Sequence, residues 1–308
     1  MLYGIIDIGS NTIRFKIYSY KNNKIKSIIS KKKTAGLISY KKNNKLNDEG
    51  IEILISTLKT FKKYMKQLKV DYTCYFATAS LRNVNNSKEI IDQVKEKLNI
   101  DIKILDSNQE AELSFEAVKN CELDHREGIL TDIGGGSSEI IAFNNKKPVE
   151  EVSLPIGSLN SYYEYVSIML PNKKEAEKIK NATLNEIKKS NIKKSNKEYM
   201  YCVGGTIRTI KKVLEHLNLK QDKTNEIPIE LLEKLENELN HNNKKYFTKI
   251  LQVKAERIHT LVPGLIITQT IAEYFNIKKI HISQNTIREG VLHSLINKEK
   301  EKIENERI

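Results

Sequence analysis

The chain opens with three successive β-rich runs, and hydrophobic and polar residues alternate in the middle one. The runs cover residues 2–8, 12–20 and 24–33, and the middle run sets Ile13 and Phe15 against polar neighbours. A period of two is typical of half-buried strands. Because the joints between the runs are short, the pattern predicts an antiparallel meander.

A helical period follows the meander. From Ile51 to Leu68, apolar residues recur at spacings of three and four with lysines on the other face, which predicts a long amphipathic helix. Asn47 or Asp48 is suited to cap its N-terminus. The pattern beyond it predicts strands at 71–77 and 102–105 and helices at 88–98 and 109–120.

The same order of elements then begins again. Strands are predicted at 128–133, 138–143, 149–154, 199–203 and 279–282, and helices at 157–166, 173–190, 205–217, 228–240, 255–275 and 286–298. The order β-β-β-α-β-α-β-α therefore occurs twice, although the halves share little residue identity. We expect an α/β protein of two duplicated domains, residues 1–120 and 121–298. A charged helix is also predicted at about 299–308, and the sequence leaves open whether it packs against the first domain.

Composition narrows the class of protein. The chain has 308 residues, enough for two domains. No run of about 18 apolar residues exists to cross a membrane, and the first strand begins without the basic region of a signal peptide. Cys74, Cys121 and Cys202 are odd in number and far apart. They argue against a disulfide framework or zinc knuckle and favour a reducing cytoplasm.

The net charge is +13, from 52 basic and 39 acidic residues. A surplus of this size suits a polyanionic partner such as polyphosphate, a nucleotide, nucleic acid or anionic lipid. Abundant Lys, Asn and Ile would also arise from an AT-biased genome with no ligand involved, so the charge leaves both interpretations open. The basic runs at 31–33 and 193–197 are expected to be solvated loops or turns.

Three strand ends contain glycine turns that suit phosphate. They are Asp7-Ile8-Gly9-Ser10-Asn11, Asp132-Ile133-Gly134-Gly135-Gly136-Ser137-Ser138-Glu139 and Gly204-Gly205-Thr206. Glycine lets the backbone approach a ligand closely, and successive N–H groups form an anion-binding nest. One such turn is more often only a tight turn, so the recurrence in both halves is the informative feature. Neither hairpin turn matches a Walker A loop or a dinucleotide fingerprint.

A duplicated unit with a phosphate loop on each first hairpin resembles the acetate and sugar kinase, heat-shock-cognate and actin superfamily. More narrowly, the chain resembles the exopolyphosphatase and guanosine pentaphosphate phosphohydrolase (Ppx/GppA) family. Eight ordered blocks carry the likeness: residues 7–14, 77–82 with Asn86, 110–111, 132–139, 154–157, 204–209, Arg257 with 263–264, and 288–290. The resemblance implies two ribonuclease-H-like domains with a cleft between them. It also implies hydrolysis of terminal phosphoanhydride bonds of inorganic polyphosphate, guanosine pentaphosphate or both.

The resemblance assigns roles to five residues. Glu110 falls on the family's catalytic glutamate, 22 residues before Asp132, and is expected to orient and deprotonate the attacking water. Asp132 and Glu139 fall on acidic positions that bind Mg²⁺ (or Mn²⁺) or assist the water, and Asp7 would bind metal from the opposite domain. Arg82 falls on an arginine that binds the phosphate being removed through bidentate, charge-assisted hydrogen bonds.

Further phosphate contacts are expected from the glycine turns and from two more arginines. These residues are Ser10, Asn11, Arg14, Gly134, Gly135, Gly136, Ser137, Gly205 and Arg208. For Arg14 and Arg208 an ion pair between the domains is an equal alternative, and Arg257 and Arg288 are expected to be structural. Phosphoryl transfer to water needs positioning and charge neutralisation more than a strong nucleophile, and this set of residues supplies both.

The chain departs from the family pattern beside the catalytic position. Asn108 and Gln109 stand where Gly and Glu are usual, and His259 stands where an aspartate is common after Arg257. These departures bear on efficiency more than on reaction class. Longer relatives append a helical, HD-like region that helps bind long polyphosphate. Nothing in these residues matches that region, so processive action on long chains is not expected.

Two other functions stay open. A kinase of the same superfamily would transfer the γ-phosphoryl group of ATP to a small molecule and would carry an adenosine pocket around residues 204–208. A polyphosphate- or (p)ppGpp-binding regulator without turnover is kept open by Asn108 and Gln109. Nucleic-acid binding is not expected, because no zinc finger, helix-turn-helix or RNP-like aromatic block is present. The resemblance implies a cytoplasmic protein of the stringent response, away from membranes, and leaves a homodimer open.

Overall fold

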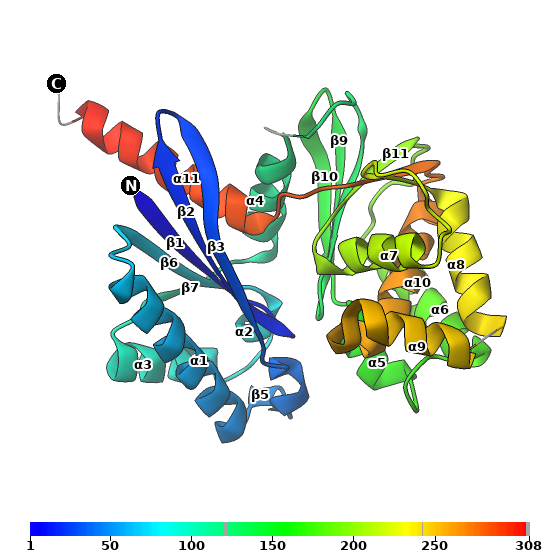
Figure 1. Cartoon of the computed structure of the whole chain (residues 1–308), viewed down its shortest axis with the longest axis horizontal. Coiled ribbons are helices and arrows are strands. Elements are labelled where there is room, and N and C mark those ends of the chain that lie inside the picture. The colour runs from blue at the N-terminus through cyan, green and yellow to red at the C-terminus, as the bar shows by residue number, and fades with distance from the viewer. Residues whose placement is uncertain (120–121, 242, 306–308) are drawn as a thin grey trace. The chain divides into compact units, whose positions relative to one another are not determined.

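The computed structural model describes residues 1–119, 122–241 and 243–305. The chain divides into two compact units (Figure 1). Unit 1 contains Met1–Leu113 and the chain from Ile287 onward, and unit 2 contains Ser114–Thr286. The predicted boundary at residues 120 and 121 lies outside the described residues, as does Cys121, whereas Cys74 and Cys202 are free thiols. None of the helices in the described ranges is both long and apolar enough to span a bilayer.

Unit 1 is built on a 5-stranded sheet in the order β3-β2-β1-β6-β7. Its strands are β1 (Leu2–Ile8), β2 (Thr12–Lys21), β3 (Lys24–Thr34), β6 (Tyr72–Ala77) and β7 (Ile102–Ile104). The first three form the predicted antiparallel meander, and β6 and β7 continue the sheet in parallel with β1. Between β3 and β6 the chain forms the 3-10 helix η1 (Leu37–Tyr40), the short pair β4 (Lys41–Lys42) and β5 (Lys45–Leu46), and the long helix α1 (Asp48–Gln67).

The helices of unit 1 cover the sheet on both faces. α1, whose N-cap is Asn47, packs with α3 (Ser87–Leu98) on one face, and α11 (Ile287–Asn305) covers the other (Figure 1). Burial of Leu292 and Ile296 against Tyr3 and Tyr18 fixes α11 on the sheet. Two further helices are α2 (Ala79–Arg82) and α4 (Ser107–Lys119), the second of which contains the unit boundary.

Unit 2 repeats this arrangement on a 6-stranded sheet in the order β10-β9-β8-β11-β13-β12. Its strands are β8 (Gly128–Ile133), β9 (Ser138–Asn144), β10 (Lys147–Leu154), β11 (Tyr199–Val203), β12 (Glu226–Pro228) and β13 (Lys279–Ile282). Again the first three are antiparallel and the next two run parallel to the first. The antiparallel strand β12 is added at the edge.

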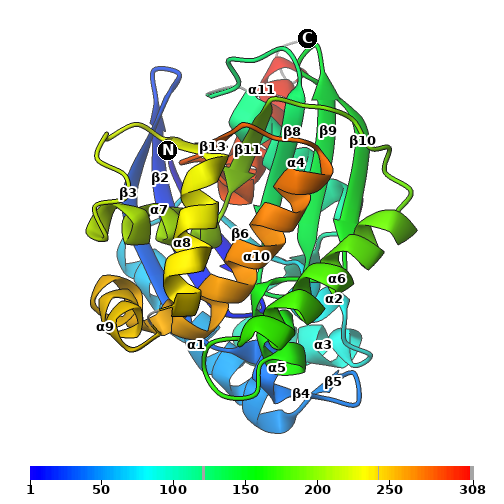
Figure 2. The ribbon, with the colours of Figure 1, turned by 90° about the vertical axis from the view of Figure 1, so that its right-hand side faces the viewer.

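The helices of unit 2 enclose its main hydrophobic core. They are α5 (Ser158–Tyr165), α6 (Lys173–Lys189), α7 (Gly205–His216), α8 (Ile229–His241), α9 (Asn243–Lys254), the 3-10 helix η2 (Ala255–Arg257) and α10 (Ile258–Tyr274). α10 lies at the centre of this group (Figure 2) and is buried around most of its circumference, from Thr260 to Ala272.

The repeated strand order confirms the predicted duplicated α/β fold. Three details differ. Residues Lys31–Lys33 lie inside β3 rather than in a loop, because the antiparallel pairing of β3 with β2 continues to Thr34. α2, α9 and β12 were not expected, since elements this short or this polar give little periodic signal. The expected break at residue 298 does not occur: one helix runs from Ile287 to Asn305, and all of it belongs with unit 1.

We expect Gly290→Ala to destabilise unit 1. In most helices this change stabilises, but here a Cβ would stand 2.0 Å from the carbonyl oxygen of Leu113. Because that oxygen belongs to backbone, the overlap should cost about 1–3 kcal/mol. Chemical denaturation measures the loss. Asn297→Ala, at an exposed position of the same helix, serves as the control, and equal stability of the two variants would contradict the close approach.

Candidate functional site

The first glycine turn joins β1 to β2 and is held by the backbone that follows β3. The N–H of Gly9 donates to the carbonyl of Thr12 at 3.2 Å. The carbonyl of Asn11 accepts from the N–H groups of Ala35 and Gly36, each at 2.9 Å, and that of Ser10 accepts from Ile38 at 3.1 Å. With these carbonyls committed, the N–H groups of Ser10 and Asn11 are the loop's means of binding an anion.

The second glycine turn, between β8 and β9, closes in the same way. The N–H of Gly134 donates to the carbonyl of Ser137 at 2.9 Å. The start of α5 takes the remaining carbonyls: Ser158 donates to Gly134, and Leu159 and Asn160 donate to Gly135, each at 2.9 Å. Within the described residues, no backbone carbonyl outside the helices and strands accepts from the N–H groups of 135–137, so this turn has three donors suited to an anion.

Gly157 is required where the second turn meets α5. A Cβ at Gly157 would stand 2.7 Å from the backbone of Gly135 and Gly136. The side chain of Asn160 adds a bond to the carbonyl of Gly136 at 3.2 Å. The sequence block at 154–157 had no assigned role, and its last residue, Gly157, allows the start of α5 to pack closely against the second glycine turn.

The two first hairpins place different side chains at equivalent positions. In unit 1 Asp7 lies directly opposite Arg14, whereas in unit 2 Asp132 lies directly opposite Glu139. Directly opposed residues share one face of the sheet. Unit 1 thus presents a carboxylate and a guanidinium beside its turn, and unit 2 presents two carboxylates.

The predicted catalytic Glu110 and phosphate-binding Arg82 form one partly buried pair. Nη1 of Arg82 lies 2.7 Å from Oε2 of Glu110, and the side chains are 17% and 12% exposed. Nη1 also donates to the carbonyl of Leu105 at 3.1 Å, which fixes the guanidinium against the end of β7. The structure therefore brings together the two residues to which family likeness assigns the roles of base and phosphate-binding group.

Gln109, one of the departures from the family pattern, caps α4. Its N–H donates to the Asp106 carboxylate at 2.8 Å, and its amide oxygen accepts from the N–H of Asp106 at 3.3 Å. This reciprocal pair is a capping box. It fixes the first turn of the helix, which carries Glu110. An amide serves this role as a carboxylate would, so the substitution preserves the placement of Glu110.

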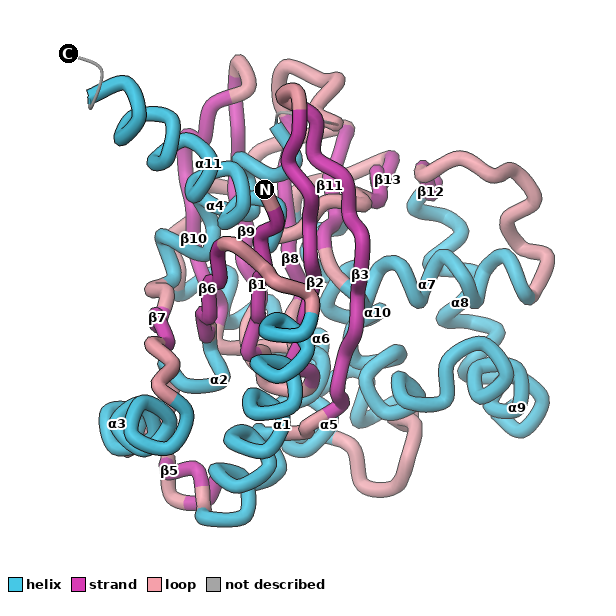
Figure 3. Tube along the Cα trace, turned by 60° about the vertical axis from the view of Figure 1, so that its left-hand side comes forward, coloured by secondary structure: helices cyan, strands magenta, loops and turns pink. Residues whose placement is uncertain are grey.

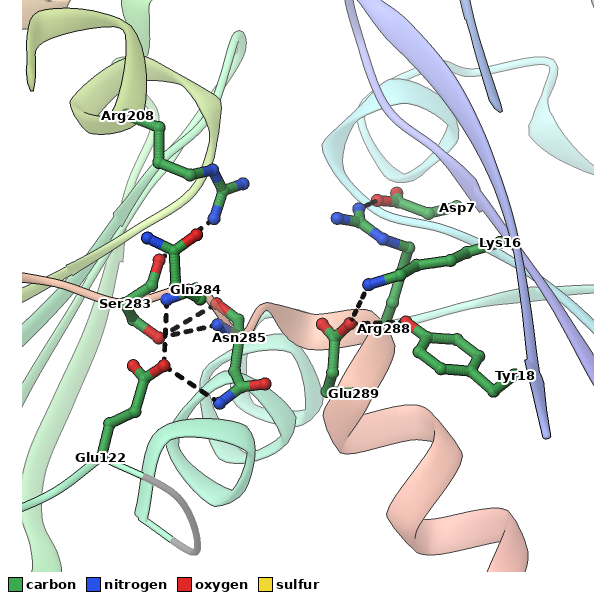
Figure 4. Close-up of polar contacts among 10 residues, drawn as sticks. All are labelled: Asp7, Lys16, Tyr18, Glu122, Arg208, Ser283, Gln284, Asn285, Arg288 and Glu289. Atoms are coloured by element: carbon green, nitrogen blue, oxygen red, sulfur yellow. Dashed lines mark hydrogen bonds and ion pairs between the residues drawn. The ribbon is translucent and has the colours of Figure 1, made fainter. Parts of the chain in front are cut away.

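Arg208 is the unit 2 counterpart of Arg82. Arg208 donates from Nη1 to the carbonyl of Ser283 after β13 at 3.1 Å, as Arg82 does to Leu105 after β7 (Figure 4). The preceding hydroxyls match as well: Ser80 donates to the carbonyl of Ile8, and Thr206 donates to that of Ile133. Sequence comparison missed this equivalence, although both segments read small-hydroxyl-aliphatic-Arg and the pattern was available to find.

Asp132 lies against the third glycine turn. Gly204 has φ +97°, and a Cβ there would stand 2.6 Å from Oδ1 of Asp132. Only glycine permits both the conformation and the approach. Gly205 begins α7, so this carboxylate sits at the start of that helix. Glu139 is 1% exposed and accepts from the hydroxyl of Ser153 at 3.0 Å.

These carboxylates suit a Mg²⁺ ion that substrate would complete. No group of three or more His, Cys, Asp or Glu side chains in the described ranges could hold a metal ion. Asp132 and Glu139 nevertheless offer hard oxygen ligands on one sheet face. Mg²⁺ is usually held by one or two carboxylates together with phosphate oxygens and water. The donor set therefore fits an ion that arrives with phosphate.

Asp7 and the start of α11 form a buried charge network in unit 1. Nη1 of Arg288 lies 2.6 Å from Oδ2 of Asp7, and Oε1 of Glu289 lies 2.6 Å from both Nζ of Lys16 and the hydroxyl of Tyr18 (Figure 4). Burial opposes ionisation of Glu289, but the charges of Lys16 and Arg288 outweigh it and lower its pKa to about 2. Arg288 thus has the structural role expected of it, and its partner is the predicted metal ligand Asp7.

Comparison with known proteins gives one family. The model of the Ppx/GppA phosphatase family matches residues 16–299. The crystal structure of the Aquifex aeolicus member of that family is 26% identical, with a TM-score of 0.80 over 97% of this chain and 98% of that one. An exopolyphosphatase from Cytophaga hutchinsonii is 21% identical, with a TM-score of 0.83 over 96% and 98%, and shares the fold.

Acid should weaken unit 1 partly through Glu289. Its folded pKa is about 2 against an ordinary 4.5, so its stabilising contribution is complete above pH 4.5 and is lost as the pH falls toward 2. The contribution lost is about 3 kcal/mol at most. Glu289→Gln should therefore flatten the fall in unfolding free energy between pH 5 and pH 2, as measured by denaturant titration. The exposed Glu96→Gln should keep the full slope; a wild-type slope in Glu289→Gln would refute the assignment.

Proposed function

The chain belongs to the Ppx/GppA phosphatase family, and we propose that it hydrolyses the terminal phosphoanhydride bond of inorganic polyphosphate, guanosine pentaphosphate or both. The observation that carries the proposal is the partly buried pair of Glu110 and Arg82, whose Oε2 and Nη1 atoms lie 2.7 Å apart. A phosphatase that uses water needs a base beside a group that holds the phosphoryl oxygens, and this pair supplies both functions at one point.

In this proposal Glu110 accepts a proton from the attacking water. Arg82 uses Nη1 for Glu110 and Leu105, so its Nε and Nη2 donors are assigned to oxygens of the terminal phosphate. A guanidinium that contacts base and phosphate together fixes their separation, which is the main requirement of this chemistry. The leaving group is the shortened phosphate chain, which departs as its own anion.

The backbone of both turns would hold the remaining phosphates. We assign Ser10 and Asn11 in unit 1 and Gly134–Ser137 in unit 2 to this role, supported by the carbonyl commitments described above. Arg14, Gly205 and Arg208 are further candidates. Asp132 and Glu139, with Asp7, would hold Mg²⁺ or Mn²⁺, and a bound ion would neutralise charge on the phosphate oxygens.

Replacing the proposed base should abolish turnover without abolishing binding. Glu110→Gln should lower kcat by about 10²- to 10⁴-fold, the usual contribution of a general base, with a smaller effect on KM. Phosphate release from polyphosphate measures both. Glu112→Gln, two residues along the same helix and exposed, should retain wild-type rates. Equal rates for Glu110→Gln and wild type would remove Glu110 from the mechanism.

Substrate class is decided by side-by-side turnover. Tripolyphosphate, long polyphosphate and guanosine pentaphosphate should each be tested for phosphate release. ATP-dependent phosphorylation of small sugars and carboxylic acids should be measured in parallel. The proposal expects release from at least one of the first three and no phosphorylated metabolite. A kinase activity with no phosphate release would overturn it.

Divalent metal should be required, and Asp132 should set its affinity. Chelation with EDTA should stop phosphate release, and added Mg²⁺ should restore it. Asp132→Asn should raise the Mg²⁺ concentration for half-maximal rate by at least about tenfold, and Mn²⁺ binding followed by electron paramagnetic resonance should weaken in step. Asp101→Asn, an exposed change in unit 1, should alter neither. Full activity in EDTA would exclude the metal assignment.

A further inference from the structure

Most of the net positive charge belongs to one segment of unit 1. Residues 8–47 contain ten Lys and one Arg and no Asp or Glu, while the whole chain has a net charge of +13. A genomic preference for Lys codons would spread the excess along the chain. The excess is instead concentrated on β2, β3 and the short strands β4 and β5. Local concentration of one sign of charge creates a field that attracts polyanions.

This segment forms a basic ribbon that begins at the first phosphate loop. Asn11 of the loop is bonded to Ala35 and Gly36, immediately after β3. From there β2 and β3 run side by side to the hairpin at Asn22 and Asn23 (Figure 3). At about 3.3 Å per residue, ten residues of strand extend roughly 30 Å from the loop. We define the basic ribbon as residues 12–34.

Lysines line the outer edge of the ribbon. β3 is the edge strand of its sheet, and all five of its lysines are exposed: Lys24, Lys26, Lys31, Lys32 and Lys33. Two like-charged pairs lie directly opposite each other across the strands, Lys24 with Lys21 and Lys32 with Arg14. Like charges in that position disfavour pairing of the two strands.

Protection of the sheet edge does not explain the sign of the charge. Edge strands commonly carry charges that prevent pairing with other chains. The edge strand β10 of unit 2 carries Glu150 and Glu151 with Pro148, the edge strand β12 contains Pro228, and β7 is only three residues long. Three other edges of this protein are thus protected without a run of lysines. The uniform positive sign of β3 calls for a ligand of opposite charge.

We propose that the basic ribbon binds the distal part of a long polyphosphate chain, of which phosphates near the reacting end are held by the Ser10–Asn11 loop. This inference rests on the proposed function for the identity of the polyanion. Continuity with the loop favours it, because one linear polymer would follow the ribbon outward from the site. The ribbon would give a hold on long chains within unit 1 itself.

A single-stranded nucleic acid fits the ribbon less well. Such binding usually depends on aromatic side chains that stack on the bases. β3 contains no aromatic residue. On β2, Phe15 and Tyr18 are each 1% exposed and therefore closed to a base, which leaves Tyr20, near the hairpin, as the one partly exposed aromatic ring of the strand. Polyphosphate needs only charge.

The test compares two triple variants with the same change in net charge. Lys24, Lys26 and Lys33 are replaced by Gln in one, and the exposed α1 residues Lys59, Lys63 and Lys66 in the other. Both are made in full-length Glu110→Gln protein so that bound polymer is not consumed. Binding of long polyphosphate, tripolyphosphate and single-stranded RNA is measured by fluorescence anisotropy competition at several salt concentrations. Thermal melting confirms that all proteins fold.

The ribbon variant should bind long polyphosphate about tenfold more weakly, as expected for loss of three exposed charge contacts. Its slope of log affinity against log salt should fall by about two to three. Tripolyphosphate, which is too short to reach beyond the loop, should bind both variants equally. Equal losses in the α1 variant would reduce the effect to general charge, and tighter binding of RNA than of polyphosphate would assign the ribbon to nucleic acid. Either result overturns the proposal.

The outcome is separable from that of the proposed function. If wild-type protein releases phosphate from tripolyphosphate but Glu110→Gln protein binds long chains no better than short ones, the ribbon proposal fails and the hydrolase stands. If long polyphosphate binds through the ribbon and no phosphate is released from any substrate, the hydrolase fails. The ribbon then remains a polyphosphate-binding surface.

Discussion

Commitment of the loop carbonyls is the constraint on which the candidate site depends. A tight turn of Gly, Ser and Asn exposes carbonyl and N–H groups alike, and exposed carbonyl oxygens would repel phosphate. In unit 1 the backbone of Ala35, Gly36 and Ile38 takes the carbonyls of the turn, and in unit 2 the start of α5 takes them. The N–H groups are left as the polar groups of the turn that can meet an anion.

The two units share one duplicated fold but differ in the side chains that they place at the candidate site. The strand order is the same in both units, and Arg82 and Arg208 make the same bond to the end of the fifth strand in chain order of the shared core. The helices that follow β7 and β13 have diverged at their first turns. Glu110 occupies the first turn of the helix after β7, whereas the helix after β13 carries Arg288, which pairs with Asp7. Each of these helix starts thus takes part in a carboxylate-guanidinium pair, but the helix supplies the carboxylate in the pair of Glu110 and the guanidinium in the pair of Arg288.

The charge distribution complements this arrangement. A positive net charge on its own does not distinguish a ligand from codon bias. The excess lies in a stretch free of acidic residues, which folds as a ribbon hydrogen-bonded at one end to the first glycine turn. The positive charge therefore extends from that turn along one hairpin. Fields of one sign raise the local concentration of oppositely charged polymers and speed their association.

The sequence by itself determined the elements and most of the site's chemistry. Periods of two and of 3.6 depend only on which residues face a core, so β1, β8, β11 and β13 were predicted with their observed bounds, and Asn47 was identified as a cap. The glycine turns could also be identified from the sequence, because turn chemistry is local. Glu110, Arg82 and Asp132 could be identified as candidate residues, because the likeness to a family is carried by short sequence blocks.

Tertiary structure decided what depends on residues far apart in the chain. α11 belongs with unit 1 because Arg288 reaches Asp7, 281 positions away, and because Gly290 admits the backbone of Leu113. The equivalence of Arg82 and Arg208 was established by their matching bonds to the carbonyls of Leu105 and Ser283. From the sequence, Gln109 was a departure from the family pattern that was expected to affect efficiency. In the structure its two hydrogen bonds with Asp106 complete the capping box of α4. Local periodicity records which face a residue presents, whereas these pairings arise only when the sheets bring distant segments together.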